Sequence, residues 1–286
     1  MKLISRLWRI LLVASFLLLP TMLWSWGFVA HKWINREAIK LLPAPLQSFY
    51  HSVADSVVEK SIDPDLRRKR VPNEEFHHYI DIDHYGRYPF AELPRDYQTA
   101  VQKFSADTLL RYGDAPWHIA RLTDSLAAAM RQGQIKTIIQ LSADLGHYVA
   151  DLHMPLHLTE NYDGQMTNNR GIHARFEWHM IERFQDRIHL TPSAVDSIAN
   201  PTEFAFEIIL SSYVWSDNLL RADTRARDPR RLYQRREDFD DAYYEKLFAL
   251  TQTVAEQQMS AAAQAVASYW YTAWLRAGRP RLMNNK

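Results

Sequence analysis

Three histidines and an aspartate occur within an otherwise apolar stretch, GHYVADLHMPLH, at 146–157. Because residues four apart share one face of a helix, His147 and Asp151 are expected to project together. Burying such ionisable side chains is costly unless they are paired or bind a metal ion. Imidazole and carboxylate are the zinc ligands available to a chain without cysteine, and this chain has none. The stretch therefore indicates a metal site.

A second pair with the same spacing strengthens this interpretation. His173 and Glu177 are four residues apart in GIHARFEWH, and Pro155 is expected to end the first helix just before His157. One such pair on a helix is more often an ordinary surface interaction. Two pairs with a histidine between them favour metal binding.

Further candidate ligands lie nearer the N-terminus. FHHYIDIDHYG contains His78, and the preceding SIDPDLRR contains Asp65, for which Asp63 is the alternative. In WGFVAHK, Trp26 precedes His31 by five residues. A free α-amino group has a pKa near 8, so an amine exposed at this tryptophan could bind a metal.

Residues 1–25 have the layout of a secretory signal, with a basic start, an apolar run over 10–19 and then small or polar residues. The run is shorter than the roughly 20 apolar residues that span a bilayer. An uncleaved anchor is the alternative, because Leu23 fits the small-residue rule poorly. We expect export (periplasmic or secreted), with cleavage after Ser25.

Cleavage there would leave 261 of the 286 residues, which suits one large domain. Removing the three basic residues of the signal changes the formal net charge from +1 to −2. Such a balance provides no broad basic field for binding polyanions. No later stretch is long and apolar enough to span a bilayer.

Helical periodicity dominates the chain and strand-like alternation is scarce, so we expect an all-α fold in a single multi-helical domain. Helices are predicted over 31–42, on both sides of Gly113 with the second ending at Gly133, and over 134–153, 173–187, 202–221 and 239–277. Irregular segments are predicted at 63–76, 83–96 and 159–171, and a solvated charged connection at 221–241.

These motifs together resemble the zinc-dependent phospholipase C and single-strand-specific nuclease superfamily, whose members are all-α enzymes with three zinc ions. The resemblance runs in order from Trp26 to Glu177, and makes residues 26–286 one zinc-dependent phosphodiesterase domain with its zinc site between helices. It implies nine metal ligands: Trp26, His31, Asp65, His78, His147, Asp151, His157, His173 and Glu177.

The resemblance also implies how these ligands are shared. One zinc would be held by Asp65, His78, His147 and Asp151, and a close neighbour by Trp26, His31 and Asp151. A third, more exposed zinc would be held by His157, His173 and Glu177. Asp65 is implied as the catalytic residue that orients or deprotonates a water bridging the close zinc pair, and the resulting hydroxide would attack the phosphodiester.

The substrate is less determined. The WGxxxH and DLHMPLH segments resemble the nuclease branch, whereas Glu177 in place of aspartate and the absence of cysteine resemble the phospholipase branch. Tyr79 is expected to bind substrate, by stacking on a base or by lining a headgroup pocket. We favour an exported, monomeric phospholipase C-like hydrolase, with a single-strand-specific nuclease as the alternative. A non-catalytic, metal-stabilised exported module is the second alternative.

The remaining histidines and aspartates of these segments carry weaker signals. His77 is the alternative ligand to His78, and His153 is expected to support the ligands rather than bind metal. A similar role through hydrogen bonds is open for Asp81, Asp83, His84 and His179. No pattern includes His51, His118 and His189, which are expected to be ordinary surface residues.

Overall fold

The computed structural model describes residues 27–283, so the predicted signal at 1–25 and Trp26 lie outside the described residues. Within 27–283 every regular element is helical, which confirms the all-α prediction. The α-helices are α2 (Phe28–Leu41), α3 (Ala44–Ser52), α4 (Ala54–Lys60), α5 (Asp63–Arg67), α6 (Tyr97–Phe104), α7 (Ala106–Arg111), α8 (Ala115–Arg131), α9 (Ile135–Leu152), α10 (Ile172–Ala174), α11 (Ile181–Phe184), α12 (Pro201–Tyr213), α13 (Ser216–Ala226) and α14 (Asp241–Arg276). The short helical turns are η1 (Glu74–His77), η2 (Ile82–Tyr85), η3 (Pro155–Leu158), η4 (Arg175–Met180), η5 (Gln185–Arg187) and η6 (Arg236–Asp238).

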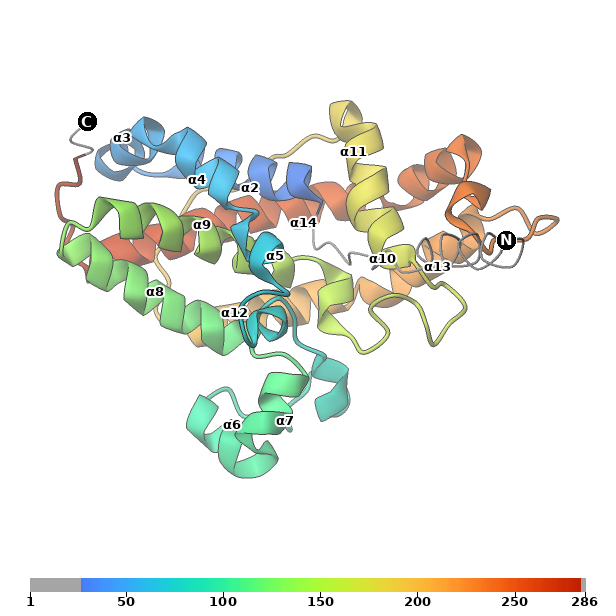
Figure 1. The fold of residues 1–286 in the computed structure, drawn as a ribbon, viewed down its shortest axis with the longest axis horizontal. Helices are drawn as coiled ribbons and strands as arrows, with labels where there is room; N and C mark the ends of the chain where they lie inside the picture. The colour runs from blue at the N-terminus through green and yellow to red at the C-terminus, as the bar shows by residue number, and fades with distance from the viewer. Residues whose placement is uncertain (1–26, 284–286) are drawn as a thin grey trace, which may run out of the picture.

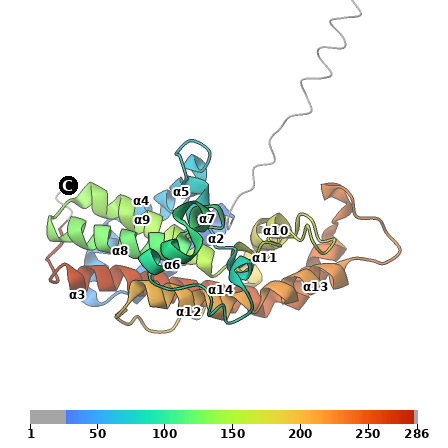
Figure 2. The same cartoon turned by 90° about the horizontal axis from the view of Figure 1, so that it is seen from below.

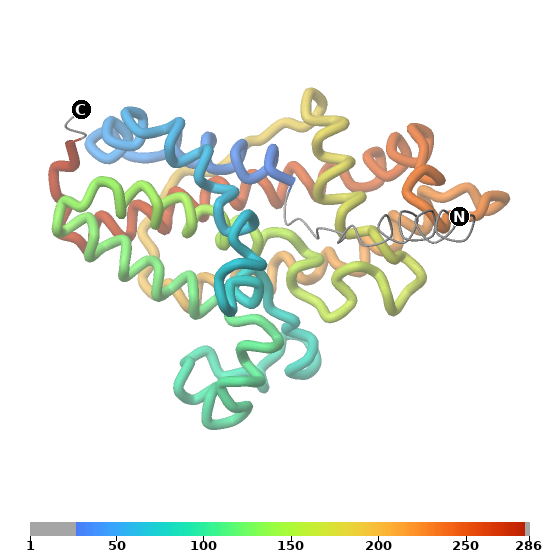
Figure 3. Tube along the Cα trace, in the orientation of Figure 1, coloured from blue at the N-terminus to red at the C-terminus, as the bar shows by residue number. Residues whose placement is uncertain are grey.

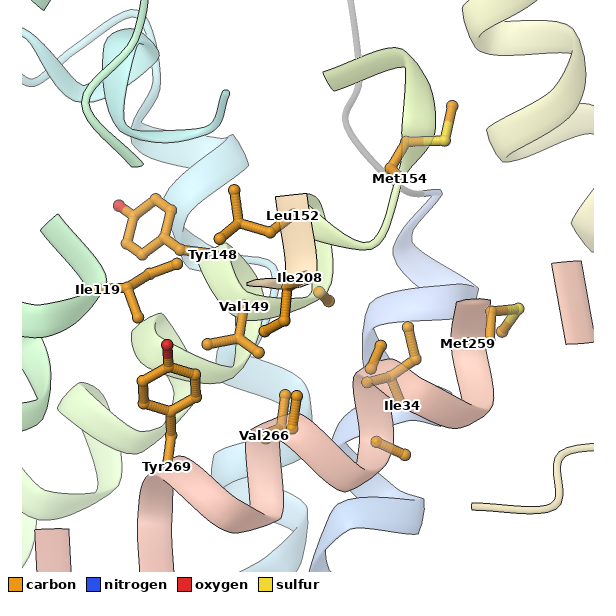
Figure 4. Packing of buried hydrophobic residues seen from close by; sticks show 14 of the residues in the cluster. Ile34, Ile119, Tyr148, Val149, Leu152, Met154, Ile208, Met259, Val266 and Tyr269 are labelled. Carbon is orange, nitrogen blue, oxygen red and sulfur yellow. The ribbon is translucent and has the colours of Figure 1, made fainter. Parts of the chain in front are cut away.

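The 36-residue helix α14 runs the length of the molecule and forms the centre of the core (Figure 1). It packs against α2, α8, α9 and α13. Val266 of α14, Ile34 of α2 and Val149 of α9 belong to one fully buried apolar cluster, seen from close by in Figure 4. The core therefore surrounds the inner faces of α2 and α9, which carry candidate ligands.

Helices α8 and α9 form a hairpin that reverses at Gly133. The φ of this glycine is +65°, a conformation that other residues rarely adopt. The segment 86–96 leads into α6 and α7, which project from one side of the body (Figures 1 and 3). The helices predicted on both sides of Gly113 and after Gly133 are confirmed as α7, α8 and α9.

Several predicted boundaries are wrong. The helix predicted over 202–221 is two helices, α12 and α13, broken at 214–215, where the Ser216 hydroxyl donates to the carbonyl oxygen of Pro155 at 2.8 Å. The segment 221–241, predicted as a solvated connection, begins inside α13, where the fully buried Asp223 forms ion pairs with Arg175 and Arg227. Most residues from 229 to 241 are exposed, as predicted.

Short helices account for the other differences. The segment predicted irregular at 63–76 contains α5, and the periodicity analysis missed α3, α4 and α6 because each buries only a few apolar residues. No helix found among residues 27–283 is both long and apolar enough to cross a membrane.

Candidate metal centre

Helix α9 carries two candidate ligands on its buried length. His147 Nε2 and Asp151 Oδ2 are 3.2 Å apart, and neither side chain is exposed. Every residue from 142 to 152 is buried, so the apolar side chains pack into the core around the helix while this pair faces other ligands. The Nδ1 atom of His147 donates to the carbonyl oxygen of Ser61 at 2.8 Å, which fixes the orientation of the ring.

Close approach of α2 to α9 brings His31 against His147. Gly146 permits this approach, because a Cβ at that position would lie 2.0 Å from Asn35 Oδ1. Asn35 is itself buried and donates to the carbonyl oxygen of His31 at 2.9 Å. The two imidazoles stack with centroids 4.0 Å apart, and His31 Nε2 lies 3.4 Å from Asp151 Oδ1.

Helix α5 brings Asp65 to the same place. Its Oδ1 atom lies 3.7 Å from both His147 Nε2 and His78 Nδ1. Asp63, the alternative from the sequence, instead accepts a hydrogen bond from the Gln140 amide at 3.2 Å. Of the two aspartates, Asp65 is the one that the fold places beside the other ligands. The first cluster is therefore made of His31, Asp65, His78, His147 and Asp151.

His78 is held by the segment 76–81, whose backbone hydrogen-bonds to the turn before α8. Gly113 lies at the closest contact, because a Cβ there would be 2.1 Å from the carbonyl oxygen of Tyr79. Its φ of +88° also favours glycine. The His78 Nδ1 atom is thereby held 3.0 Å from Asp151 Oδ2.

His157, His173 and Glu177 form a second cluster. His157 lies on the η3 turn that begins at Pro155, and its Nδ1 atom donates to the carbonyl oxygen of His78 at 2.7 Å. The Glu177 carboxylate lies 2.7 Å from His173 Nε2 and 3.5 Å from His157 Nε2. The two clusters are therefore linked through the backbone of His78.

A buried ion pair holds the helix of the second cluster. Arg175 begins the π-helical turn η4, and π-turns are frequent at functional sites. Its guanidinium donates to Asp223 Oδ1 of α13 at 2.7 and 3.0 Å and to the carbonyl oxygen of Arg170 at 2.9 Å. Tyr243 of α14 donates to the same aspartate. This hub, made of Arg175, Asp223 and Tyr243, connects η4, α13 and α14.

The donor atoms form three groups, and within each group they lie within 4.8 Å of one another: His31, Asp65 and His147; His78, His147 and Asp151; His157, His173 and Glu177. The buried oxygens of Asp65 and the Nε2 atoms of His78 and His157 make no hydrogen bond to any described residue. Leaving such atoms unpaired costs about 1–3 kcal/mol each. This set of nitrogen and carboxylate donors fits zinc.

The electrostatics of the clusters are consistent with cation binding. Burial raises the pKa of Asp65 to about 7 and lowers that of His31 to about 4. Burial opposes protonation of His147 and His157 too, but Asp151, together with Asp65 for His147 and Glu177 for His157, outweighs it and raises their pKa values to about 9 and about 8. Protons on these rings balance the carboxylate charge, and a divalent cation would displace them.

A cleft of about 270 Å³ opens onto the second cluster, with His157 and His173 in its wall. The rest of its lining includes an arginine, three aromatic rings and two carboxyl groups: Arg68, Phe76, Tyr79, Tyr162, Glu75 and Asp81. Burial, together with Asp83 and Glu160, raises the pKa of Asp81 to about 7. Tyr79, the predicted substrate contact, thus lines the cleft beside the candidate ligands.

His77 and His118 contact each other and belong to none of the three donor groups. His77 Nδ1 is 2.5 Å from Asp114 Oδ1, and its ring stacks on His118 with centroids 3.9 Å apart. The surface role predicted for His118 is wrong, because the first turn of α8 packs its ring against His77. His51 and His189 are exposed, as predicted.

The other polar candidates lie outside the three donor groups. Their neighbours are Thr159 for Asp83, Tyr112 for His84, Gln258 for His153 and Trp178 for His179. His179 lines a separate hollow of about 560 Å³ between α11 and the start of α14. Sequence reasoning missed Arg68, Tyr162 and Asp223, because none of them belongs to a spaced motif.

Trp26 lies outside the described residues, so its role as a ligand stays a prediction. The next residue, Gly27, donates from its backbone nitrogen to the carbonyl oxygen of Glu177 at 3.4 Å. A Cβ on Gly27 would lie 2.8 Å from Trp178 Cδ1. The chain therefore enters α2 beside a ligand of the second cluster, with no space for a side chain at residue 27.

No protein-family model and no curated protein matches this sequence. Among solved structures, the fold is similar to that of the alpha toxin from Clostridium absonum, with a TM-score of 0.53 and 15% sequence identity. The similarity covers 90% of this chain and 65% of the toxin chain, so this chain spans less than two thirds of the toxin's length. The chain therefore has the all-α fold of this alpha toxin, which confirms the fold expected from the resemblance to the zinc-dependent phospholipase C and single-strand-specific nuclease superfamily.

Proposed function

We propose that this protein is an exported, zinc-dependent phosphodiester hydrolase of the phospholipase C type. The observation that carries the proposal is the convergence of eight of the nine implied ligands in three donor groups, one of which lines a cleft. Zinc bound there would lower the pKa of a water molecule and neutralise charge on the phosphoryl oxygens. A non-catalytic module would need only closed metal sites, whereas the second cluster offers three ligands and lies in the wall of a cleft.

Asp65 and Arg68 would have separate roles in hydrolysis. Asp65 would orient the attacking water and accept its proton, because neither oxygen of its carboxylate makes a hydrogen bond to a described residue. Arg68 in the cleft would bind a phosphate oxygen of the substrate. Arg68 follows Asp65 by three residues at the end of α5 and lines the cleft with His157 and His173, so both groups would act on a phosphodiester bound there.

The cleft lining favours a phospholipid headgroup. Tyr79, Tyr162 and Phe76 provide aromatic faces, and Glu75 and Asp81 provide carboxyl groups. Aromatic faces with carboxylates bind a quaternary ammonium group, because cation–π attraction and ion pairing add. The same carboxylates would repel the neighbouring phosphates of a nucleic acid.

Nuclease activity is the second candidate, because Tyr79 lines the cleft next to the ligand His78 and could stack on an unpaired base. Parallel assays on phosphatidylcholine vesicles, single-stranded DNA and a water-soluble phosphodiester reporter would distinguish the branches. We expect hydrolysis of the reporter and of phosphatidylcholine that is lost with a chelator and restored by zinc. Cleavage of DNA alone would select the nuclease, and cleavage of no substrate would leave the non-catalytic module.

Export and a monomeric state complete the proposal. Cleavage between Ser25 and Trp26 would free the amine that the superfamily uses as a ligand. Mass spectrometry of the protein recovered outside the cytoplasm is expected to find a chain beginning at Trp26, and its sedimentation in solution is expected to match a monomer. A chain that keeps residues 1–25 would contradict the export step.

A further inference from the structure

Exposed apolar side chains gather on two segments beside the cleft. Leu66 and Val71, at the end of α5 and in the turn after it, are each 44% exposed. Tyr162 and Met166, between η3 and α10, are 39% and 65% exposed. Single exposed apolar residues are common in soluble proteins, but a group around one cleft marks an interaction surface.

Both segments contribute to the wall of the same cleft. Arg68 from the first and Tyr162 from the second both line the cleft. In Figure 2 both segments lie on the side of the molecule away from α12 and α14. A flat partner resting on this side would contact both segments and cover the cleft.

The first segment also carries positive charge without partners. Arg67 is held by Glu74 and Asp144, but the next three residues, Arg68, Lys69 and Arg70, form no ion pair with any residue in 27–283. Lys69 and Arg70 are exposed beside Val71. Cations next to exposed apolar side chains suit the interface of an anionic bilayer, where both find favourable contacts.

We propose that this cleft rim, made of residues 66–71 and 162–166, docks the protein on a bilayer that contains anionic lipid. Lys69 and Arg70 would contact lipid phosphates, and Val71 and Met166 would enter the headgroup region. A nucleic acid would engage the same cations but leave the apolar side chains in water, so the rim favours a membrane. The inference rests on the proposed function in one respect, because it makes the membrane the source of the substrate.

The test measures binding to vesicles of equal parts phosphatidylcholine and phosphatidylglycerol, by sedimentation in the cold. Each basic residue near an anionic surface contributes roughly fivefold to binding, so Lys69→Glu with Arg70→Glu should lower the partition coefficient by at least about 25-fold. Val71→Ser with Met166→Ser should lower the partition coefficient severalfold, both on these vesicles and on vesicles of phosphatidylcholine alone. The matched control, Lys136→Glu with Lys246→Glu, reverses the same charge on exposed lysines of α9 and α14 and should bind like the parent protein.

Hydrolysis of the water-soluble reporter separates docking from catalysis, and all three double variants should keep the parent rate. Vesicle binding that is equal in the rim variants and the parent would overturn the proposal. Rim variants that lose binding to single-stranded DNA but not to vesicles would also overturn it. If binding depends on the rim but neither the parent protein nor any variant cuts the reporter, the docking surface stands and the proposed hydrolase fails.

Discussion

Asp63 and Asp65 lie two residues apart in α5, yet their carboxylates have different surroundings. Asp63 is bonded to Gln140 and lies 3.4 Å from Lys60 Nζ, and its side chain is 31% exposed. Asp65 is buried among the imidazoles of the first cluster. Residues two apart project to nearly opposite sides of a helix, so one aspartate is a natural control for the other.

The first prediction uses this pair. Asp65→Asn should remove zinc from the first cluster and lower the rate of reporter hydrolysis by about 10²- to 10⁴-fold, because a ligand and the proposed base are lost together. Asp63→Asn should change neither the zinc content nor the rate of reporter hydrolysis by more than about twofold, since it alters only a partly exposed hydrogen bond. Elemental analysis and reporter kinetics measure both effects, and the reverse pattern would transfer the role to Asp63.

His118 provides a pH-dependent prediction. Burial and the neighbouring His77 lower the pKa of His118 from 6.5 to about 3. Between these pH values the unfolded chain binds the extra proton, so the stability contributed by neutral His118 is complete above pH 6.5 and is lost as pH falls toward 3.

His118→Gln should therefore make unfolding less sensitive to acid. The slope of unfolding free energy against pH should fall by up to about 1.4 kcal/mol per pH unit between pH 6 and about 4. Urea unfolding with excess chelator, which removes the contribution of zinc, measures the slope in both proteins. Identical slopes would show that the pKa of His118 is the same in the folded and the unfolded protein, which would contradict the lowered value.

Among the elements, strength of periodicity decides what the sequence can predict. Helices α2, α8, α9 and α14 bury long apolar stripes, and all four were predicted at nearly the observed bounds. Helices α3, α4 and α6 are short and bury few residues, so a pattern search has little to detect. The break at 214–215 depends on contacts with η3 that are remote in sequence.

In the candidate site, motifs within one helix are predictable from the sequence, whereas contacts between distant segments are not. Spaced pairs such as His147 with Asp151 and His173 with Glu177 are visible in the sequence because the helix repeat imposes their spacing. The pairing of Arg175 with Asp223 joins residues 48 apart and leaves no local pattern. For this reason the segment containing Asp223 was predicted to be solvated.

The buried ion pair between Arg175 and Asp223 should affect both the stability of the fold and zinc binding. Asp223→Ala would leave the guanidinium of Arg175 buried without its carboxylate, which should lower the free energy of unfolding by about 3–5 kcal/mol. Zinc bound by His173 and Glu177 should dissociate faster than zinc bound in the first cluster, because η4 is no longer held by the ion pair between Arg175 and Asp223. Denaturant unfolding and zinc release to a chromogenic chelator measure these effects.

The control for this variant is Asp241→Asn. It breaks the exposed ion pair between Arg183 and Asp241, whose carboxylate side chain is 90% exposed. Such pairs contribute about 0–1 kcal/mol, so stability and zinc release should stay near those of the parent. Equal effects of the two substitutions would mean that the hub does not position the second cluster.

Across the whole molecule, the ligands come from separate parts of the chain. His31 lies in α2, Asp65 in α5, His147 in α9 and Glu177 in η4. Zinc bound to all of them would join helices that are distant in sequence, and its binding energy would add to the stability of the fold.

Chelation should therefore lower the melting temperature. A change of 1 kcal/mol shifts Tm by about 2–4 °C for a domain of this size, so losing a few kcal/mol of binding energy should shift it by roughly 10 °C. Calorimetry with and without chelator measures the shift, and added zinc should reverse it. Chelator already saturated with zinc is the control, and an unchanged Tm would contradict a structural contribution from the metal.

We propose three zinc ions per chain, two in the first cluster, whose two donor groups share His147, and one in the second cluster. Elemental analysis of the purified mature protein, after zinc loading and gel filtration, tests it most directly. We predict about three zinc ions per chain, the number that the resemblance to the zinc-dependent superfamily implies. A protein that retains one zinc ion or none would contradict a site for three zinc ions.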